Sequence, residues 1–226
     1  MKNYVNGLAT KERIFEACKE LFCEKGYLGT TYTDICKLAQ VHPGTITHHF
    51  TSKKNIASII FDDIIRVFYQ RSAELFPDAD DLQQVMTASG MHQKLLFDDA
   101  VYRRFSSEYS SEVSHVKSLL QYTDSVPKAY EVTLDRVGKK KADFLFTAYK
   151  GMDCYIESYI DAHIDELTFE EVFEYIAVIY YQYEPSVSLK KRIAKALSAL
   201  AGVRITFDCF NIKVLEIAGK RPTKNT

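Results

Sequence analysis

The sequence predicts an all-α protein. Apolar residues recur three and four positions apart along most of the 226-residue chain, which is the period of a helix with one buried face. The chain has only 5 Pro and 9 Gly, too few for the many turns of an all-β fold. No convincing strand pattern, internal repeat or low-complexity run interrupts the helical periodicity. We therefore expect a bundle of helices joined by short loops.

Three short helices are expected near the N-terminus. Thr10 is predicted to cap the first helix and Gly26 to end it. Thr31 and Asp34 have the spacing of a capping box, which would begin the second helix. Pro43 suits the first position of the third helix, where its missing N–H costs nothing. Three short helices, the last two joined by a tight turn, are typical of a helix-turn-helix.

Longer helices are expected in the rest of the chain. Ser52 is predicted to cap a fourth helix, which stops before Pro77. Later helices are predicted over residues 142–163, over residues 168–183 behind a second capping box, and over residues 188–217. The last two carry wide apolar faces, which predicts that they pair with a second copy of the chain.

The N-terminal segment resembles a known family. Residues 26–35, GYLGTTYTDI, resemble the end of helix 1 and the start of helix 2 in the tetracycline-repressor (TetR) family. Residues 41–50, VHPGTITHHF, resemble its recognition helix, and residues 51–54, TSKK, resemble its entry into helix 4. The resemblance implies a DNA-binding domain over residues 1–55 and a helical effector-binding and dimerisation domain over residues 56–226.

The resemblance also implies a set of DNA contacts. The amides at the start of the second helix, with the Thr30 and Thr31 hydroxyls, can hold a phosphate, and Lys53 can pair with another. Thr31 can equally serve only as a helix cap, and His49 is expected to be partly packed. The candidate DNA-binding residues are Thr30, Thr31, Tyr32, Thr33, His42, Pro43, Gly44, Thr45, Thr47, His48, His49 and Lys53.

Three residues depart from the family pattern. Gln40 stands where Gly is frequent, and Thr47 stands where Tyr is usual. Pro43 replaces a frequent Lys or Arg and so removes a phosphate partner. The missing basic side chain at Pro43 keeps an alternative open, in which the chain is a dimeric interaction protein of the same fold that has lost sequence-specific DNA binding.

The expected function is that of a ligand-responsive transcriptional regulator, by family habit a repressor. The resemblance implies a homodimer that reads a palindromic double-stranded DNA operator and is released by an unknown small-molecule effector. An enzyme is not expected, because the sequence has no HExxH, Gly-rich phosphate loop, CxxC pair or nucleophile elbow. No cofactor and no metal site is predicted.

Charge and cysteine content agree with this assignment. The whole chain has a net charge of −1, yet residues 1–55 hold eight basic and five acidic side chains, as expected for contact with nucleic acid at one end. The five cysteines are odd in number and are interpreted as reduced thiols, with a redox sensor as the lesser alternative. The N-terminus has no signal-peptide pattern and no apolar run reaches membrane-spanning length, so the sequence predicts a cytoplasmic protein.

A ligand site is predicted on the helix over residues 142–163. Its apolar residues cover more than half of a helical wheel, which is typical of a helix buried within its domain. Asp153 falls inside that apolar arc, and His163 near its centre. Asp153 can anchor a largely apolar, cationic effector, or it can pair with a neighbouring Lys or Arg while His163 simply ends the helix. The candidate ligand-binding residues are Tyr149, Met152, Asp153, Ile156 and His163.

Overall fold

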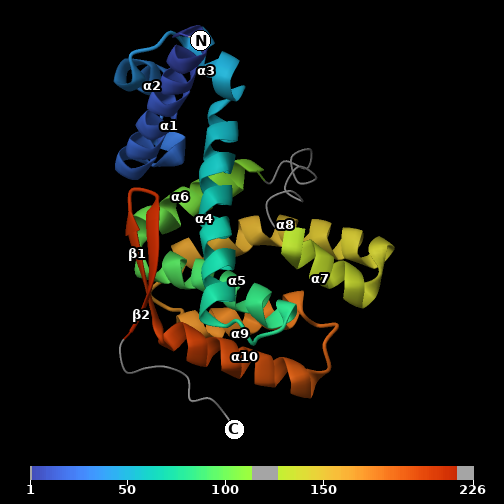
Figure 1. Cartoon of the computed structure of the whole chain (residues 1–226). Helices are drawn as coiled ribbons and strands as arrows, with labels where there is room; N and C mark the ends of the chain where they lie inside the picture. Colours follow the sequence, from blue (N-terminus) through green and yellow to red (C-terminus); the bar gives the residue numbers. More distant parts are fainter. Residues whose placement is uncertain (1, 114–126, 218–226) are drawn as a thin grey trace.

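The computed structural model describes residues 2–113 and 127–217 of the chain (Figure 1). Within those residues it has ten helices followed by one antiparallel hairpin. The elements in chain order are α1 (Lys2–Gly29), α2 (Tyr32–Ala39), α3 (Pro43–Phe50), α4 (Lys53–Leu75), α5 (Asp81–Asp98), α6 (Ala100–Val113), α7 (Pro127–Val137), α8 (Lys139–Ala162), α9 (Phe169–Tyr180), α10 (Ser186–Ala201), β1 (Val203–Asp208) and β2 (Asn211–Glu216). The predicted helical fold class is thus confirmed, apart from the hairpin.

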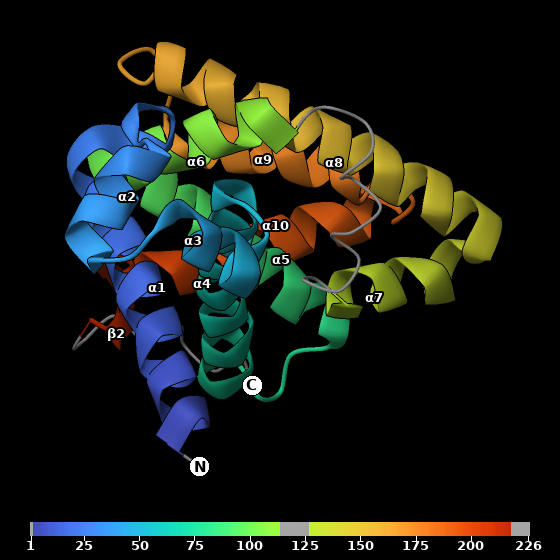
Figure 2. The ribbon, with the colours of Figure 1, turned by 90° about the horizontal axis from the view of Figure 1, so that it is seen from above.

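Helices α1–α3 form a head at one end of the molecule, and the long helix α4 leads from this head into the body (Figure 1). Helix α5 lies at the centre of the body, between α4, α6, α9 and α10. Gly90 allows that packing, because a Cβ at this position would lie 2.4 Å from Leu200 Cδ1 and 2.8 Å from Phe173 Cε2. Seen from above, α8 lies along one edge of the body with α6 and α9 beside it (Figure 2).

Most of the predicted signals at the boundaries of the head helices are confirmed. Thr31 and Asp34 form both hydrogen bonds of a capping box, Pro43 is the first residue of α3, and the Ser52 side chain accepts from Asn55 N at the start of α4. Gly26 adopts φ 80° and ψ 170°, which breaks the helical backbone. The predicted start of the first helix is wrong, because α1 begins at Lys2 and Thr10 lies inside it.

The end of the chain differs from the predicted long helix. Helix α10 ends at Ala201, and the next residues form the β1–β2 hairpin, in which Asp208 pairs with Asn211. Apolar residues at 203, 207, 210 and 214 imitate the helical period. Gly202 ends α10, however, and β1 is rich in β-branched and aromatic residues that favour a strand. Helix α9 also ends earlier than predicted, at Tyr180.

The apolar face of α10 is buried within the subunit. It packs on α5, α9 and β1 through Leu189, Ile193, Ala196, Ala199 and Leu200. The large apolar side chains that stay exposed in this part of the body lie mainly on α8 and α9, with Val187 at the start of α10. Among the described residues, no helix combines the length and hydrophobicity needed to cross a membrane.

Candidate nucleic-acid interface and ligand cavity

Helices α2 and α3 present one polar face to solvent. The apolar side of α3 is anchored by Ile46 and Phe50, which are 0% and 3% exposed. Phe50 stacks on Phe15 of α1 at a centroid distance of 6.2 Å. The opposite side of the two helices is therefore held in a fixed orientation. The predicted DNA contacts exposed there are Thr31, Tyr32, Thr33, His42, Pro43, Gly44, Thr47 and His48.

Thr45 and His49 lie at the edge of this face and are half-buried. The rings of His48 and His49 lie 5.1 Å apart in an edge-on arrangement. His49 is thus partly packed, as the helical spacing predicted. Thr47 and His48 are exposed on α3, and their contact with DNA stays a prediction.

The two threonines before α2 have different environments. The Thr31 hydroxyl donates to Asp34 Oδ2 at 2.7 Å and accepts from Asp34 N at 3.1 Å, so it caps the helix. Thr30 is 2% exposed, and its hydroxyl donates to Gly26 O at 2.7 Å. The prediction that the Thr30 hydroxyl holds a phosphate is therefore corrected, because this hydroxyl faces the interior and closes the end of α1.

Lys53 also has an internal role. Its Nζ donates to Tyr27 O at 2.8 Å and to Thr30 O at 2.9 Å, and it lies 4.3 Å from the centroid of the Tyr27 ring. Its backbone N–H donates to the Tyr32 hydroxyl at 2.8 Å. Burial lowers the pKa of the Lys53 ammonium from its usual value. Lys53 thus joins the end of α1 to the starts of α2 and α4, and the phosphate role expected of it is not supported in this arrangement.

Replacing Lys53 by methionine is expected to lower the free energy of unfolding by about 1–3 kcal/mol, because the variant loses charge-assisted hydrogen bonds to two carbonyls. The salt dependence of DNA binding is expected to stay unchanged. Urea denaturation would measure the first effect and binding at several salt concentrations the second. Lys37→Met, which changes an exposed lysine of α2, is the matched control for stability. A salt slope reduced by about one with unchanged stability would instead assign Lys53 to a phosphate.

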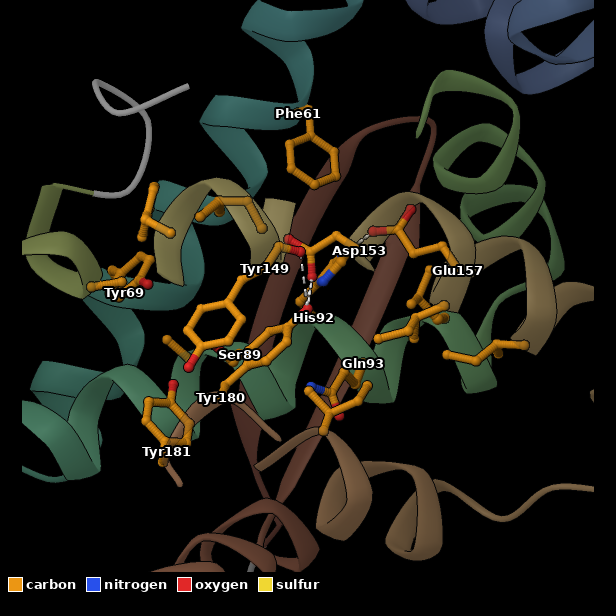
Figure 3. A pocket seen from close by; sticks show the side chains of 18 of the residues that line it. Phe61, Tyr69, Ser89, His92, Gln93, Tyr149, Asp153, Glu157, Tyr180 and Tyr181 are labelled. Atoms are coloured by element: carbon orange, nitrogen blue, oxygen red, sulfur yellow. Dashed lines mark hydrogen bonds and ion pairs between the residues drawn. The ribbon is translucent and has the colours of Figure 1, made fainter. Parts of the chain in front are cut away.

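The body contains a cavity of about 130 Å³ between α4, α5, α7, α8 and α9 (Figure 3). Its wall is largely aromatic and aliphatic, with Phe61 from α4, Phe146 and Tyr149 from α8, and Tyr180 from α9. Tyr149 and Tyr180 stack at a centroid distance of 4.6 Å. An apolar cavity with a small number of placed polar groups is typical of a small-molecule site.

Two carboxylates of α8 line one end of the cavity. Glu157 is 6% exposed and accepts from the hydroxyls of Ser106 and Ser110 of α6, both at 2.6 Å. Its other carboxylate oxygen lies 3.9 Å from His92 Nε2. Asp153, one turn earlier, accepts a hydrogen bond from the Tyr180 hydroxyl. Burial and the nearby Asp153 charge raise the pKa of that hydroxyl well above its usual value, so Tyr180 stays protonated and donates.

Three of the five predicted ligand residues line the cavity, namely Tyr149, Asp153 and Ile156. Met152 is not among the lining residues. His163 lies outside the cavity, where its Nδ1 contacts Tyr159 O at 3.0 Å and its ring stacks on Tyr159 at 4.1 Å. The alternative in which His163 ends its helix is the one observed. Sequence reasoning missed Glu157, although its position four residues after Asp153 places both on one helix face.

Helix α6 links the cavity to the head. Ser106 and Ser110 hold Glu157 on one side of α6, as described above. On the side facing α1, Arg104 donates to Cys23 O at 2.7 Å, and Glu108 accepts from Leu28 N at 2.9 Å. Helix α6 therefore contacts both the wall of the cavity and the end of α1.

The chain was compared with known proteins. Residues 14–58 match the family model described as bacterial regulatory proteins, tetR family. The chain is 42% identical over 55 residues to the HTH-type transcriptional regulator UidR of Escherichia coli (strain K12), a match that covers 24% of this chain and 28% of that protein. It is 44% identical over 46 residues to the biofilm operon icaADBC HTH-type negative transcriptional regulator IcaR of Staphylococcus aureus (strain Newman), covering 20% and 25%. The matched part of the chain thus spans less than a third of the length of these relatives.

Solved structures resemble the chain over a greater length but at lower identity. One is a putative tetR family transcription regulator from Shewanella sp. PV-4, with 16% identity and a TM-score of 0.46 over 76% of this chain and 96% of that one. Another is the fatty acid degradation regulator FadR from Bacillus halodurans, with 16% identity and a TM-score of 0.46 over 78% and 95%. Neither likeness identifies a ligand for the cavity.

Proposed function

We propose that the chain, whose residues 14–58 match the model of the tetR family of bacterial regulatory proteins, is a ligand-responsive, DNA-binding transcriptional regulator that acts as a homodimer. The observation that carries this proposal is the exposed polar face of α2 and α3, held in place by the buried Ile46 and Phe50. A helix that is fixed from behind and polar in front can enter a major groove. We expect the protein to act as a repressor and its operator to be palindromic.

A mobility-shift assay with DNA from upstream of the protein's own gene tests this function. We expect a specific complex that survives excess unrelated DNA and weakens steeply as salt is raised. The competing candidate, a dimeric protein without specific DNA binding, is favoured by Pro43, which leaves the start of α3 without a basic side chain. A dimer that binds specific and unrelated DNA equally weakly would support that candidate instead.

The sequence predicted a dimer interface on residues 168–183 and 188–217, which correspond to α9 and α10; we propose instead that the interface lies on α8 and α9. These helices expose an apolar face, whereas the apolar face of α10 is covered by α5 and β1. Singly exposed apolar residues are common, but α8 and α9 each expose three apolar residues at helical spacing, which favours an interaction surface. A matching row on a second copy would complete a four-helix bundle. The exposed apolar residues of this surface are Phe144, Tyr155, Tyr159, Tyr175, Val178 and Ile179.

Replacing Tyr155 by lysine is expected to shift the dimer toward monomer by roughly 100-fold in the dissociation constant, because the symmetric interface would bury the new charge twice. Tyr155 is 76% exposed in the subunit, so folding of the monomer should be unaffected. Multi-angle light scattering across a dilution series measures the change. Val187→Lys on α10 is the matched control, at a residue 66% exposed. Dissociation by Val187→Lys and not by Tyr155→Lys would move the interface to α10.

We propose that the effector occupies the cavity between α4 and α9. The volume of about 130 Å³ is near the roughly 150 Å³ of an apolar cavity known to hold benzene, so the occupant has about the size of one ring. The aromatic wall favours an apolar body, and the carboxylates of Asp153 and Glu157 favour a hydrogen-bond-donating, cationic head group. This proposal adopts the first of the two roles predicted for Asp153, in which its carboxylate anchors a ligand.

Phenethylammonium and the neutral 2-phenylethanol form a matched pair of probes for the cavity. We expect the cation, at concentrations well above its dissociation constant, to raise the melting temperature by a few degrees, and the alcohol to have a smaller effect. Asp153→Asn should remove the preference for the cation. Equal stabilisation by both probes, or a preference that persists in Asp153→Asn, would show that the carboxylate does not select the ligand.

A further inference from the structure

The tip of the β1–β2 hairpin lies against helix α1 of the head, far from it in sequence. In Figure 1 the hairpin extends from the end of α10 toward the end of α1 that points into the body. At its tip, Cys209 Sγ donates to Lys19 O at 3.5 Å. Cys23 is one helical turn after Lys19, so it lies on the face of α1 that Cys209 contacts. The two cysteines are therefore brought to the same side of α1, at the boundary between head and body.

The backbone at the tip is strained in a way that fixes this contact. Cys209 and Phe210, the two residues of the turn, have φ values of 43° and 68°. Two-residue hairpin turns with positive φ normally use Asn and Gly, because other side chains fit this region poorly. Such strain persists only where the surroundings impose the conformation. Here the Phe210 ring packs at 4.6 Å from Phe105 and 5.2 Å from Phe207, and Cys209 is directed toward α1.

Both cysteines are partly exposed. Cys23 and Cys209 are half-buried, whereas Cys18, nearby on α1, is 0% exposed. Burial, followed by the neighbouring Cys209, raises the pKa of the Cys23 thiol, so Cys23 is protonated at neutral pH. The raised pKa disfavours the Cys23 thiolate and so its direct attack on a peroxide; its position beside the Cys209 contact, not its acidity, makes it the partner for an already oxidised Cys209 sulfur.

We propose that Cys23 and Cys209 are a redox modification site that takes hydrogen peroxide and closes a reversible disulfide between the head and the hairpin. Cys209 sulfur attacks one oxygen of the peroxide, the O–O bond breaks, and the leaving hydroxide takes the thiol proton to give water and a sulfenic acid. Cys23 sulfur then attacks Cys209 sulfur, the S–O bond breaks, and the Cys23 proton leaves with that hydroxide as a second water. The two sulfurs lose two electrons, which the peroxide gains.

The disulfide would join α1 to the hairpin covalently. It would thus be a second connection between head and body, besides helix α4. The head would then be held in the position seen in this structure, relative to α6 and the cavity. This inference is independent of whether the protein binds DNA, because it concerns only the two thiols and the elements that bring them together.

Peptide mapping of the full chain tests the proposal. The reduced protein is treated with hydrogen peroxide, remaining thiols are alkylated, and a non-reducing tryptic digest is analysed by mass spectrometry. We expect one linked species that contains Cys23 and Cys209, is lighter than its separate peptides by two hydrogens, and disappears with dithiothreitol. A non-reducing gel should show the linked protein at monomer size, since the link is within one chain.

Two variants serve as controls. Cys36→Ser, on α2, should leave the linked species unchanged, and Cys209→Ser should abolish it. The proposal is overturned if Cys23 and Cys209 both remain alkylatable at peroxide concentrations that oxidise free cysteine. It is equally overturned if Cys209 accumulates as sulfinic acid beside a free Cys23, or if Cys23 is found linked to another cysteine.

Discussion

Replacing Gly26 by alanine is expected to lower the free energy of unfolding by about 2–4 kcal/mol, one of the largest effects of any small substitution in this chain. Gly26 has φ 80° and ψ 170°, a region that residues with a Cβ essentially do not occupy. The space is also filled, because a Cβ would lie 2.6 Å from Glu108 Oε2. Glu108 would have to move and would lose its hydrogen bond to Leu28 N.

Gly29→Ala is the matched control. This glycine also lies at the end of α1, has no positive φ, and would place its Cβ in ordinary contact at 3.5 Å from Lys25 Cβ. Denaturant unfolding of both variants measures the difference. We expect the Gly26 variant alone to be strongly destabilised, because it alone requires a backbone change and breaks the contact between α1 and α6. Equal stability of the two variants would contradict the conformation described for Gly26.

The sequence predicted local features well. Thr31 with Asp34, Thr168 with Glu171, and Ser52 were all expected to cap helices and do so. Each of these caps is a contact within three residues of the chain, so residue type and spacing suffice to predict it. The anchors of α3 are similar, because one buried face of a short helix follows from its apolar spacing.

Features that depend on distant contacts were predicted less well. The hairpin at Val203–Glu216 was read as helix, since its apolar residues fit a helical period and its partner strand lies beyond the turn. The side-chain directions of Thr30 and Lys53 also escaped prediction. Both are determined by carbonyl groups near the end of α1, and for Lys53 these lie 26 and 23 residues away. A family position predicts where a residue lies in the fold, but not which neighbour its side chain binds.

The ligand site was predicted in part for the same reason. The helical wheel places Asp153 inside an apolar arc, which is a property of one helix. The serines that hold Glu157 come from α6, and the tyrosine that donates to Asp153 comes from α9. Only the fold brings these three helices to one cavity. The acidic end of the cavity therefore became visible as a cluster only in the structure.

A negative charge on the exposed face of α3 is expected to abolish specific DNA binding. Thr47 is exposed at the centre of that face, between the buried Ile46 and the exposed His48. In Thr47→Glu, a carboxylate would approach the acceptor-rich base edges and the phosphates of the groove. Juxtaposed like charges cost several kcal/mol, so we expect a loss of roughly 100-fold or more in affinity.

The measurement must separate this effect from folding and from net charge. Ala194→Glu adds the same charge to an exposed position of α10, in the body, and should leave DNA affinity within about twofold of the unmodified protein, since screening limits its reach. Unfolding curves of both variants should match that of the unmodified chain, because both residues point to solvent. If both Thr47→Glu and Ala194→Glu retained full affinity for the operator, α3 could not be the helix that enters the groove. Selective loss in Thr47→Glu would tie DNA binding to the face that Ile46 and Phe50 hold in place.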